Sequence, residues 1–141
     1  MSDSLNERRE QLQHVNPESG FDPRPLGFSA AVITPPNARF VFVSGQLDAA
    51  PNAPFDQQVR GSFRQLEQVL IEAGASLGTV VVITNLVVGL DSERLATLSR
   101  ARRKLFGDRG PTSTTHGVHC LASPHALFEV NALAVTLKAN G

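Results

Sequence analysis

The densest group of side chains able to do chemistry lies in GPTSTTHGVH, residues 110–119, where four hydroxyl side chains precede two histidines. Three kinds of site could use this stretch: a metal site on His116 and His119, a serine nucleophile at Ser113, or the polar wall of a ligand pocket. Side chains alternate between faces along a strand, so His116 and Cys120 would share one face about 13 Å apart, with His119 on the other. In a strand, one metal ion cannot bind all three.

A helix would bring these ligands together, but Pro111, three threonines and Gly117 disfavour a helix in this stretch. Ser113 lies in no strand-to-helix elbow and has no evident general base beside it, which argues against a nucleophile. We interpret Cys120 as a small buried hydrophobic residue. The metal site and the nucleophile are therefore both disfavoured.

Glu129 is the second candidate for chemistry, because it stands inside FEVNALAV on an apolar strand face. Burying a carboxylate there is costly unless it has hydrogen-bond partners or works at a cleft. Two interpretations stay open. Glu129 is either an interface residue paired with a neighbouring subunit, or a group that accepts or donates a proton in a reaction.

A basic cluster raises the question of RNA binding; it comprises Arg100, Arg102, Arg103, Lys104 and Arg109. Acidic residues flank this cluster, and the chain has no tyrosine or tryptophan that could stack on bases. We interpret the cluster as a solvated helix face. Nucleic acid is therefore not an expected partner.

Composition limits the class of protein. The chain has 141 residues, 41% of them hydrophobic, with 13 basic and 13 acidic side chains, which suits one globular domain. No apolar run is long enough for a bilayer, and one cysteine cannot form an internal disulfide. The polar stretch MSDSLNERREQ shows no secretory signal, so we expect a cytoplasmic protein without a membrane role.

The elements that must position these residues follow from hydrophobic periodicity. Residues 1–22 are predicted to be a tail or short helix without a core role, and residues 23–141 a single domain. Strands are predicted at 28–34 and 38–45, as a hairpin, and at 79–88, 112–122 and 125–137. Helices are predicted between Pro54 and Gly74, and from an N-cap at Asp91 or Ser92. The order ββαβαββ predicts an α+β sheet with both helices on one side.

The last strand predicts an assembly. Both of its faces are largely apolar, yet two helices can cover only one face of a four- or five-stranded sheet. One face would carry Phe128, Val130, Ala132 and Ala134, and the other Leu127, Glu129, Asn131, Leu133 and Val135. The uncovered face favours contact with further copies of the chain, so we expect a homo-oligomer that buries Leu127, Leu133 and Val135.

Five segments, GFSAAV, FVFVSGQ, EAGASLGTVV, PTSTTHGV and FEVNALAV, resemble in order and spacing the YjgF family of reactive-intermediate deaminases (Rid), formerly called endoribonuclease L-PSP. The resemblance covers roughly residues 16–138. It implies a chorismate-mutase-like α+β subunit and a homotrimer with ligand clefts between subunits. It also implies hydrolysis of reactive enamines and imines to ketoacids and ammonia, without metal or organic cofactor.

The resemblance also implies which residues form the pocket. Ser44 and Gly45 match the family's pocket serine and glycine, and Glu129 matches the glutamate that positions the hydrolytic water. Ser113 stands where the motif PxR[ST]T has the arginine that binds the substrate carboxylate. With Thr115, it would leave a hydroxyl-lined pocket wall in place of an arginine clamp.

Two further pocket positions depart from the family: Phe28 replaces a common tyrosine and Ser99 a common asparagine. We therefore expect a hydrolase of an imine, enamine or related small molecule that lacks an α-carboxylate or presents it differently. The alternative is a non-catalytic homotrimer that binds a small molecule. A ribonuclease is disfavoured, since a basic stripe and stacking residues are missing.

Overall fold

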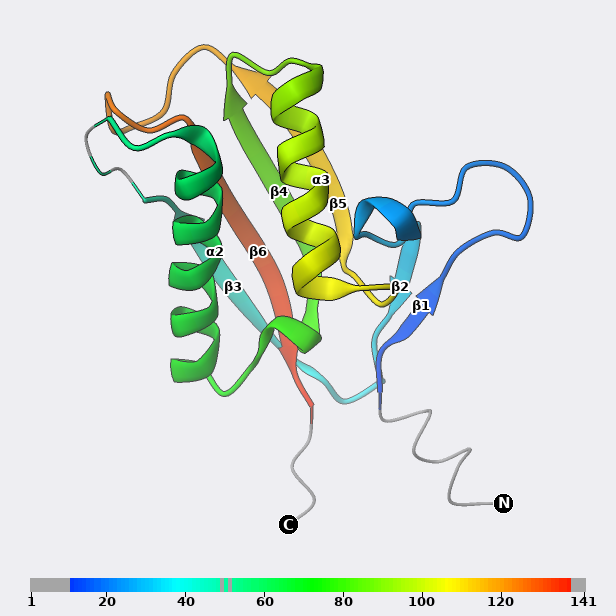
Figure 1. Cartoon of the computed structure of the whole chain (residues 1–141). Helices are drawn as coiled ribbons and strands as arrows, with labels where there is room; N and C mark the ends of the chain where they lie inside the picture. The colour runs from blue at the N-terminus through cyan, green and yellow to red at the C-terminus, as the bar shows by residue number, and fades with distance from the viewer. Residues whose placement is uncertain (1–10, 49, 51, 138–141) are drawn as a thin grey trace.

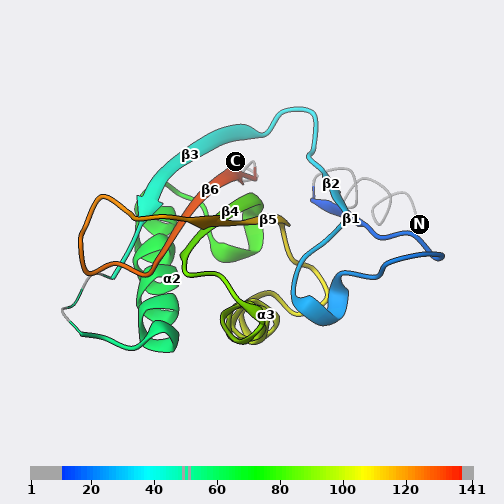
Figure 2. The same ribbon diagram turned by 90° about the horizontal axis from the view of Figure 1, so that it is seen from above.

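Two helices pack on one face of a four-stranded sheet (Figure 1). This computed structural model describes residues 11–48, 50 and 52–137. The sheet order is β3 (Arg39–Gln46), β6 (Phe128–Thr136), β4 (Val80–Val88) and β5 (Thr112–Val118), and the helices are α2 (Phe55–Glu72) and α3 (Ser92–Phe106). Seen from above, both helices lie on the same side of the sheet (Figure 2). The predicted α+β class is confirmed.

Both predicted helices are present, and local sequence explains their limits. The buried residues of α2 include Val59, Phe63, Leu66 and Leu70, which recur at three- and four-residue steps. Helix α3 begins after Asp91, whose carboxylate accepts a hydrogen bond from the Arg94 N–H, a cap that stabilises by roughly 1 kcal/mol. Among the helices of the described part, none is long and apolar enough to cross a membrane.

Strand β6 lies in the middle of the sheet, antiparallel to both of its neighbours, and β4 runs parallel to β5. Its helix-facing side chains Phe128, Val130, Ala132 and Ala134 join the main core, as the alternation predicted. The 3₁₀ turn η2 (Leu77–Thr79) leads into β4. The strand that carries Glu129 is thus paired along both of its edges, as is β4.

The predicted hairpin between residues 28–34 and 38–45 is wrong. Strand β2 (Ala31–Ile33) pairs instead with β1 (Gln13–Val15), and β3 pairs with β6. The prediction joined neighbours in sequence, whereas β3 buries Val43 against the helices by pairing with the central strand. The first segment also has a core role, because Leu12 is only 5% exposed. Residues 1–10 lie outside the described part.

The small β1–β2 sheet is attached to the start of β5. Both the His14 Nδ1–H and the Ser29 hydroxyl donate to the carbonyl oxygen of Gly110, at 2.9 and 2.6 Å. Between the two strands, the 3₁₀ turn η1 (Arg24–Leu26) packs beside α3 (Figure 1). This attachment brings residues 24–28 next to the strand that carries the hydroxyl-rich stretch.

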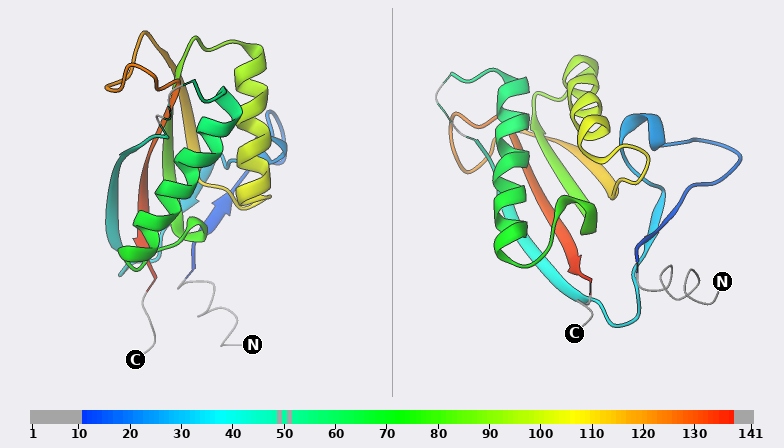
Figure 3. Two further views of the ribbon diagram at one scale, coloured as in Figure 1. Left: turned by 60° about the vertical axis from the view of Figure 1, so that its left-hand side comes forward. Right: turned by 60° about the horizontal axis from the view of Figure 1, so that its bottom comes forward.

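The sheet face opposite the helices is partly apolar and open. Phe40 and Phe42 of β3 are 59% and 80% exposed there, and no helix of the described residues covers this side (Figure 3, left). Val135 is an exception to the expected interface, because it is fully buried with Leu12 and Val81 of the same chain. The prediction that Val135 contacts another subunit is therefore wrong.

Candidate functional site

Three of the predicted site residues, Ser44, Gly45 and Glu129, lie together on the open face. Glu129 of β6 pairs with Leu86 of β4, and the β3–β6 ladder shifts register between Val43 and Gln46. The Glu129 carboxyl group lies directly over Gly45. A Cβ atom there would be 2.5 Å from its Cδ and 2.8 Å from both oxygens. Only glycine leaves this space for the carboxylate.

The other four predicted residues, Phe28, Ser99, Ser113 and Thr115, surround the guanidinium of Arg102. Its Nη1 donates to Ser113 Oγ at 3.1 Å and to Thr115 Oγ1 at 3.4 Å, and its Nη2 donates to Ser99 Oγ at 3.1 Å. The guanidinium carbon also lies 5.1 Å from the centroid of the Phe28 ring, a cation–π contact. Arg102 is the centre of this group.

Arg102 corrects the interpretation of the basic cluster as a solvated face, because the residue is only 3% exposed. A sequence signal was available: Leu95, Leu98, Arg102 and Leu105 follow steps of three and four residues. Arg102 lies one turn after Leu98, and these two are the buried residues of α3, whereas Leu95 and Leu105 at the ends of the stripe stay partly exposed. The residue type suggested solvent, while the spacing indicated burial.

The η1 turn completes the surroundings of Arg102. The Arg102 Nε–H donates to the Leu26 carbonyl oxygen at 3.1 Å. Gly27 follows with φ +81°, and a Cβ there would lie 2.3 Å from the backbone nitrogen of Arg103. Glycine is required both by this left-handed conformation and by the contact with α3. The turn therefore places Phe28 over the guanidinium.

Asn85 of β4 belongs to this group of contacts, and the sequence reasoning missed it. It is fully buried, and its Nδ2 donates to Ser113 Oγ at 2.8 Å and to Thr115 Oγ1 at 3.4 Å. The Asn85 amide has two N–H groups, and its nearest acceptors are Ser113 Oγ and the Thr114 carbonyl oxygen at 3.1 Å. The Ser113 oxygen thus accepts from both Arg102 and Asn85, whereas the Thr115 oxygen accepts chiefly from Arg102. Within the described residues, neither hydroxyl donates to an acceptor. Their protons are available to a ligand.

The guanidinium of Arg102 is a buried charge without a buried counter-charge. Among residues 11–48, 50 and 52–137, no carboxylate lies within 4 Å of it. Desolvation by burial lowers the pKa of Arg102 to about 10, so the group remains protonated at neutral pH. Burying an ion that only neutral acceptors hold is costly. An anionic partner would offset this cost.

A pocket of about 810 Å³ lies over this guanidinium. Phe28, Ser99, Arg102, Ser113 and Thr115 all line it. Three more cationic side chains line it as well, Arg100, Arg103 and Lys104, and the described lining contains no carboxylate. Outside the lining, Asp108 forms an ion pair with Arg103. The pocket is therefore suited to an anion.

The two groups of predicted residues lie on opposite faces of the sheet. Ser113 and Thr115 pair with Ile83 and Asn85, which are buried under the helices. Glu129 pairs with Leu86, the β4 residue between Asn85 and Val87, and therefore points to the open face. Within one chain, the Glu129 carboxylate and the Arg102 pocket are separated by the sheet.

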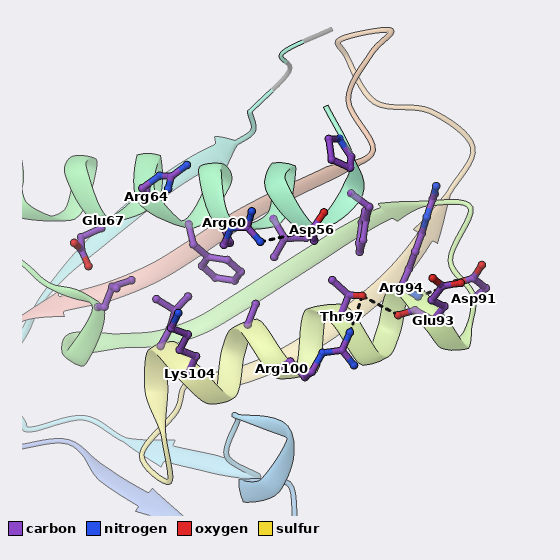
Figure 4. A pocket seen from close by; sticks show the side chains of 17 residues that line it. Asp56, Arg60, Arg64, Glu67, Asp91, Glu93, Arg94, Thr97, Arg100 and Lys104 are labelled. Carbon is purple, nitrogen blue, oxygen red and sulfur yellow. Dashed lines mark hydrogen bonds and ion pairs between the residues drawn. The ribbon is translucent and has the colours of Figure 1, made fainter. Parts of the chain in front are cut away.

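A second hollow, of about 890 Å³, lies between α2 and α3 (Figure 4). None of the seven predicted site residues lines it. Acidic and basic side chains alternate along its walls, and the Arg60–Asp56 ion pair of 3.0 Å spans one turn of α2. This groove has no clear preference for one sign of charge.

Of the histidines in the opening stretch, His116 lies on the open face in the same cross-strand row as Glu129, because both residues pair with Leu86. Strand β5 ends at Val118, so His119 and Cys120 follow it in an exposed loop. The interpretation of Cys120 as a buried residue is therefore wrong. In the part of the chain that the structure describes, no three His, Cys, Asp or Glu side chains are placed to share a metal ion.

Proteins with a similar fold were found among solved structures. A conserved Rid-family protein of unknown function from Yersinia pestis, YyfB, has a TM-score of 0.78 and 29% identity, covering 89% of this chain and 98% of its own. Rv2704 from Mycobacterium tuberculosis, a member of the YjgF/YER057c/UK114 family, has a TM-score of 0.62 and 27% identity, covering 89% and 99%. Yeast Mmf1, at 21% identity and TM-score 0.61, covers 89% and 98% and shares the fold.

Among curated proteins, none matches the chain significantly. The family model described as Endoribonuclease L-PSP matches residues 23–136, which include all seven predicted site residues and Arg102. Since this match spans most of the chain, and the Rid and YjgF structures share its fold, the protein belongs to the endoribonuclease L-PSP family, the YjgF/Rid proteins.

Proposed function

We propose that the protein hydrolyses a small imine or enamine in a cleft formed between two copies of the chain. The observation that carries this proposal is the separation of Glu129 from the Arg102 pocket by the sheet. Each group is an incomplete site on its own. A second copy docked on the open face would bring its own pocket to the Glu129 of the first copy, as in the homotrimer that the family resemblance implies.

The apolar open face supports such an assembly. Phe40 and Phe42 expose most of their rings on the face where Glu129 lies, and exposed aromatic residues of this size favour a protein partner. In a closed ring of three copies, the open face of each chain would meet the pocket of the next chain. The ring would then contain three equivalent clefts. We propose the homotrimer as the working form.

The chemistry follows from the position of the carboxylate. Glu129 would take a proton from a water molecule while the water oxygen bonds to the imine carbon. The protonated Glu129 then gives this proton to the imine nitrogen, which completes a carbinolamine. Transfer of the carbinolamine hydroxyl proton to nitrogen, again through Glu129, lets the carbon–nitrogen bond break and releases ammonia and a carbonyl compound. The protein need only orient the water and transfer its protons, a contribution of ~10² to 10⁴ in rate. Gly45 keeps the space beside the carboxylate open.

Ammonia release tests the proposal directly. Imines and enamines would be generated in the assay by a lyase or an amino acid oxidase, and carbonyl product and ammonia followed with and without the protein. We expect faster release of both products in equal amounts. Binding of such compounds without any acceleration would replace the proposal with the alternative, a non-catalytic small-molecule-binding homotrimer.

Replacing Gly45 with alanine is expected to lower kcat/KM for the responsive imine by about 10- to 100-fold, because the new methyl group displaces the Glu129 carboxylate. Thermal unfolding should change little, since residue 45 is exposed. Gly78→Ala is the matched control, because a Cβ there meets only Ser76 Oγ, at 3.6 Å. Equal activity of the Gly45→Ala and parent proteins would show that the carboxylate needs no such space.

A further inference from the structure

We propose that Arg102, projecting from helix α3, binds the anionic group of the ligand, and that Ser113 and Thr115 complete the anion site with their hydroxyl protons. This inference deepens the proposed function, because it assigns the residue that selects a substrate bearing a carboxylate. It also revises the expectation of a substrate without an α-carboxylate. The inference rests on the contacts that the Arg102 side chain makes, and not on a match between Arg102 and a family motif.

The first step is the count of donors around the pocket. A guanidinium has five N–H groups. Four of those of Arg102 are used, on Leu26, Ser99, Ser113 and Thr115, so one remains on Nη2. The Ser113 hydroxyl is held as a donor by Arg102 and Asn85, and the Thr115 hydroxyl by Arg102. Around the guanidinium the free groups are therefore mainly donors, with the buried Asn85 Oδ1 as an acceptor that has no partner among the described residues. Several donors beside a positive charge select an anion.

The second step concerns the role of Ser113. Its short side chain leaves room for the Arg102 guanidinium, which lies 3.1 Å from Ser113 Oγ. An arginine at position 113 would project into the same space, and two guanidinium groups there would repel each other. The chain therefore carries its pocket cation on the helix instead of the strand. Asn85 and Ser113 act as positioning residues, since they hold the cation and the hydroxyls in place.

The third step concerns the kind of anion. The fork of a guanidinium matches the two oxygens of a carboxylate, and the Phe28 ring packs over its plane. Arg100 and Lys104 add positive charge to the lining, in which Arg103 is paired with Asp108, and the described lining residues include no carboxylate. A small organic carboxylate fits this combination.

The test is equilibrium binding of pyruvate and of its neutral isostere pyruvamide to the assembled protein, by calorimetry or ligand-observed NMR. The parent should bind pyruvate at least about 30-fold more tightly than pyruvamide, and Arg102→Met should abolish that preference by raising the Kd for pyruvate alone. Arg64→Met, which removes the same charge from the groove between the helices, should leave the preference intact.

Two variants keep the test decisive if Arg102→Met does not fold. Arg102→Lys keeps the charge but loses the fork, and should bind pyruvate more weakly than the parent and more tightly than pyruvamide. The double variant Arg102→Ala/Ser113→Arg moves the cation to the strand and should regain part of the preference. Equal affinity of the parent for pyruvate and pyruvamide, or a preference that persists in Arg102→Met, would overturn the inference.

Failure of this inference can be told apart from failure of the proposed function. Pyruvate preference in a protein that hydrolyses no imine would contradict only the catalytic proposal. Fast hydrolysis of neutral and anionic imines alike would contradict only the role of Arg102.

Discussion

Glutamine at position 129 is expected to lower kcat for imine hydrolysis by ~10² to 10⁴, while the protein still binds its ligand. The amide has nearly the size of the carboxylate and fits the same space over Gly45, but it cannot accept a proton from water. The measurement is the steady-state rate of ammonia release from the imine that responds best to the parent, with the amount of assembled protein checked by light scattering.

The matched control is Glu67→Gln, the same chemical change on an exposed turn of α2. This control should keep the parent rate and the parent melting temperature. A Glu129→Gln protein that turns over the imine as fast as the control would show that another group, or water alone, accepts the proton. The remaining interpretation of Glu129 would then be a structural residue at a subunit contact.

Mixing two inactive variants is expected to restore activity. A Glu129→Gln chain keeps its Arg102 pocket, and an Arg102→Met chain keeps its carboxylate. If each cleft takes its two halves from different chains, random trimers from a 1:1 mixture carry both intact halves in about a quarter of their clefts. The mixture should therefore recover about a quarter of the parent rate on an anionic imine, whereas each variant alone stays near background.

The measurement requires mixed oligomers, so the two variants would carry different tags and be co-expressed. Doubly tagged trimers leave out the trimers of a single variant, so about a third of their clefts should be intact and they should show about a third of the parent rate. The control places Phe42→Asp on both chains. A charge on this 80% exposed ring position of the open face should prevent assembly and, with it, the recovery of activity. Doubly tagged oligomers without recovered activity would show that the two halves do not meet across an interface.

Local patterns were enough to predict the helices and the faces of the last strand. The step of three and four residues from Val59 to Leu70 marked α2, and alternation in FEVNALAV separated Phe128 from Glu129. The pairing of strands was harder to predict. Ala31–Ile33 pairs with Gln13–Val15, and a long irregular segment separates the two in sequence. Pairing is decided by tertiary contacts, which residues close in sequence do not reveal.

Seven residues of the candidate site were predicted from the sequence. Arg102, around which four of them lie, was not. The family motif led to Ser113 and Ser99, but the motif is silent about an arginine on α3. Residue type placed Arg102 in solvent, although its spacing from Leu98 indicated the inner face. Asn85 carried a similar signal, since it interrupts the apolar run TVVVITNLVV on the side of Ile83 and Val87. A polar residue within such an apolar run is a candidate site residue in the same way as a residue of the family motif.

The central place of β6 has a consequence for synthesis of the chain. Strand β6 is the last of the described strands in sequence, yet both β3 and β4 take their hydrogen bonds from it. Until residue 136 has left the ribosome, β3 has no partner, and its aromatic residues and unpaired backbone stay available to other nascent chains. Glu129 is also added to the chain after every other candidate residue. A growing polypeptide therefore completes its sheet and gains the carboxylate proposed to act on the substrate in the same late step.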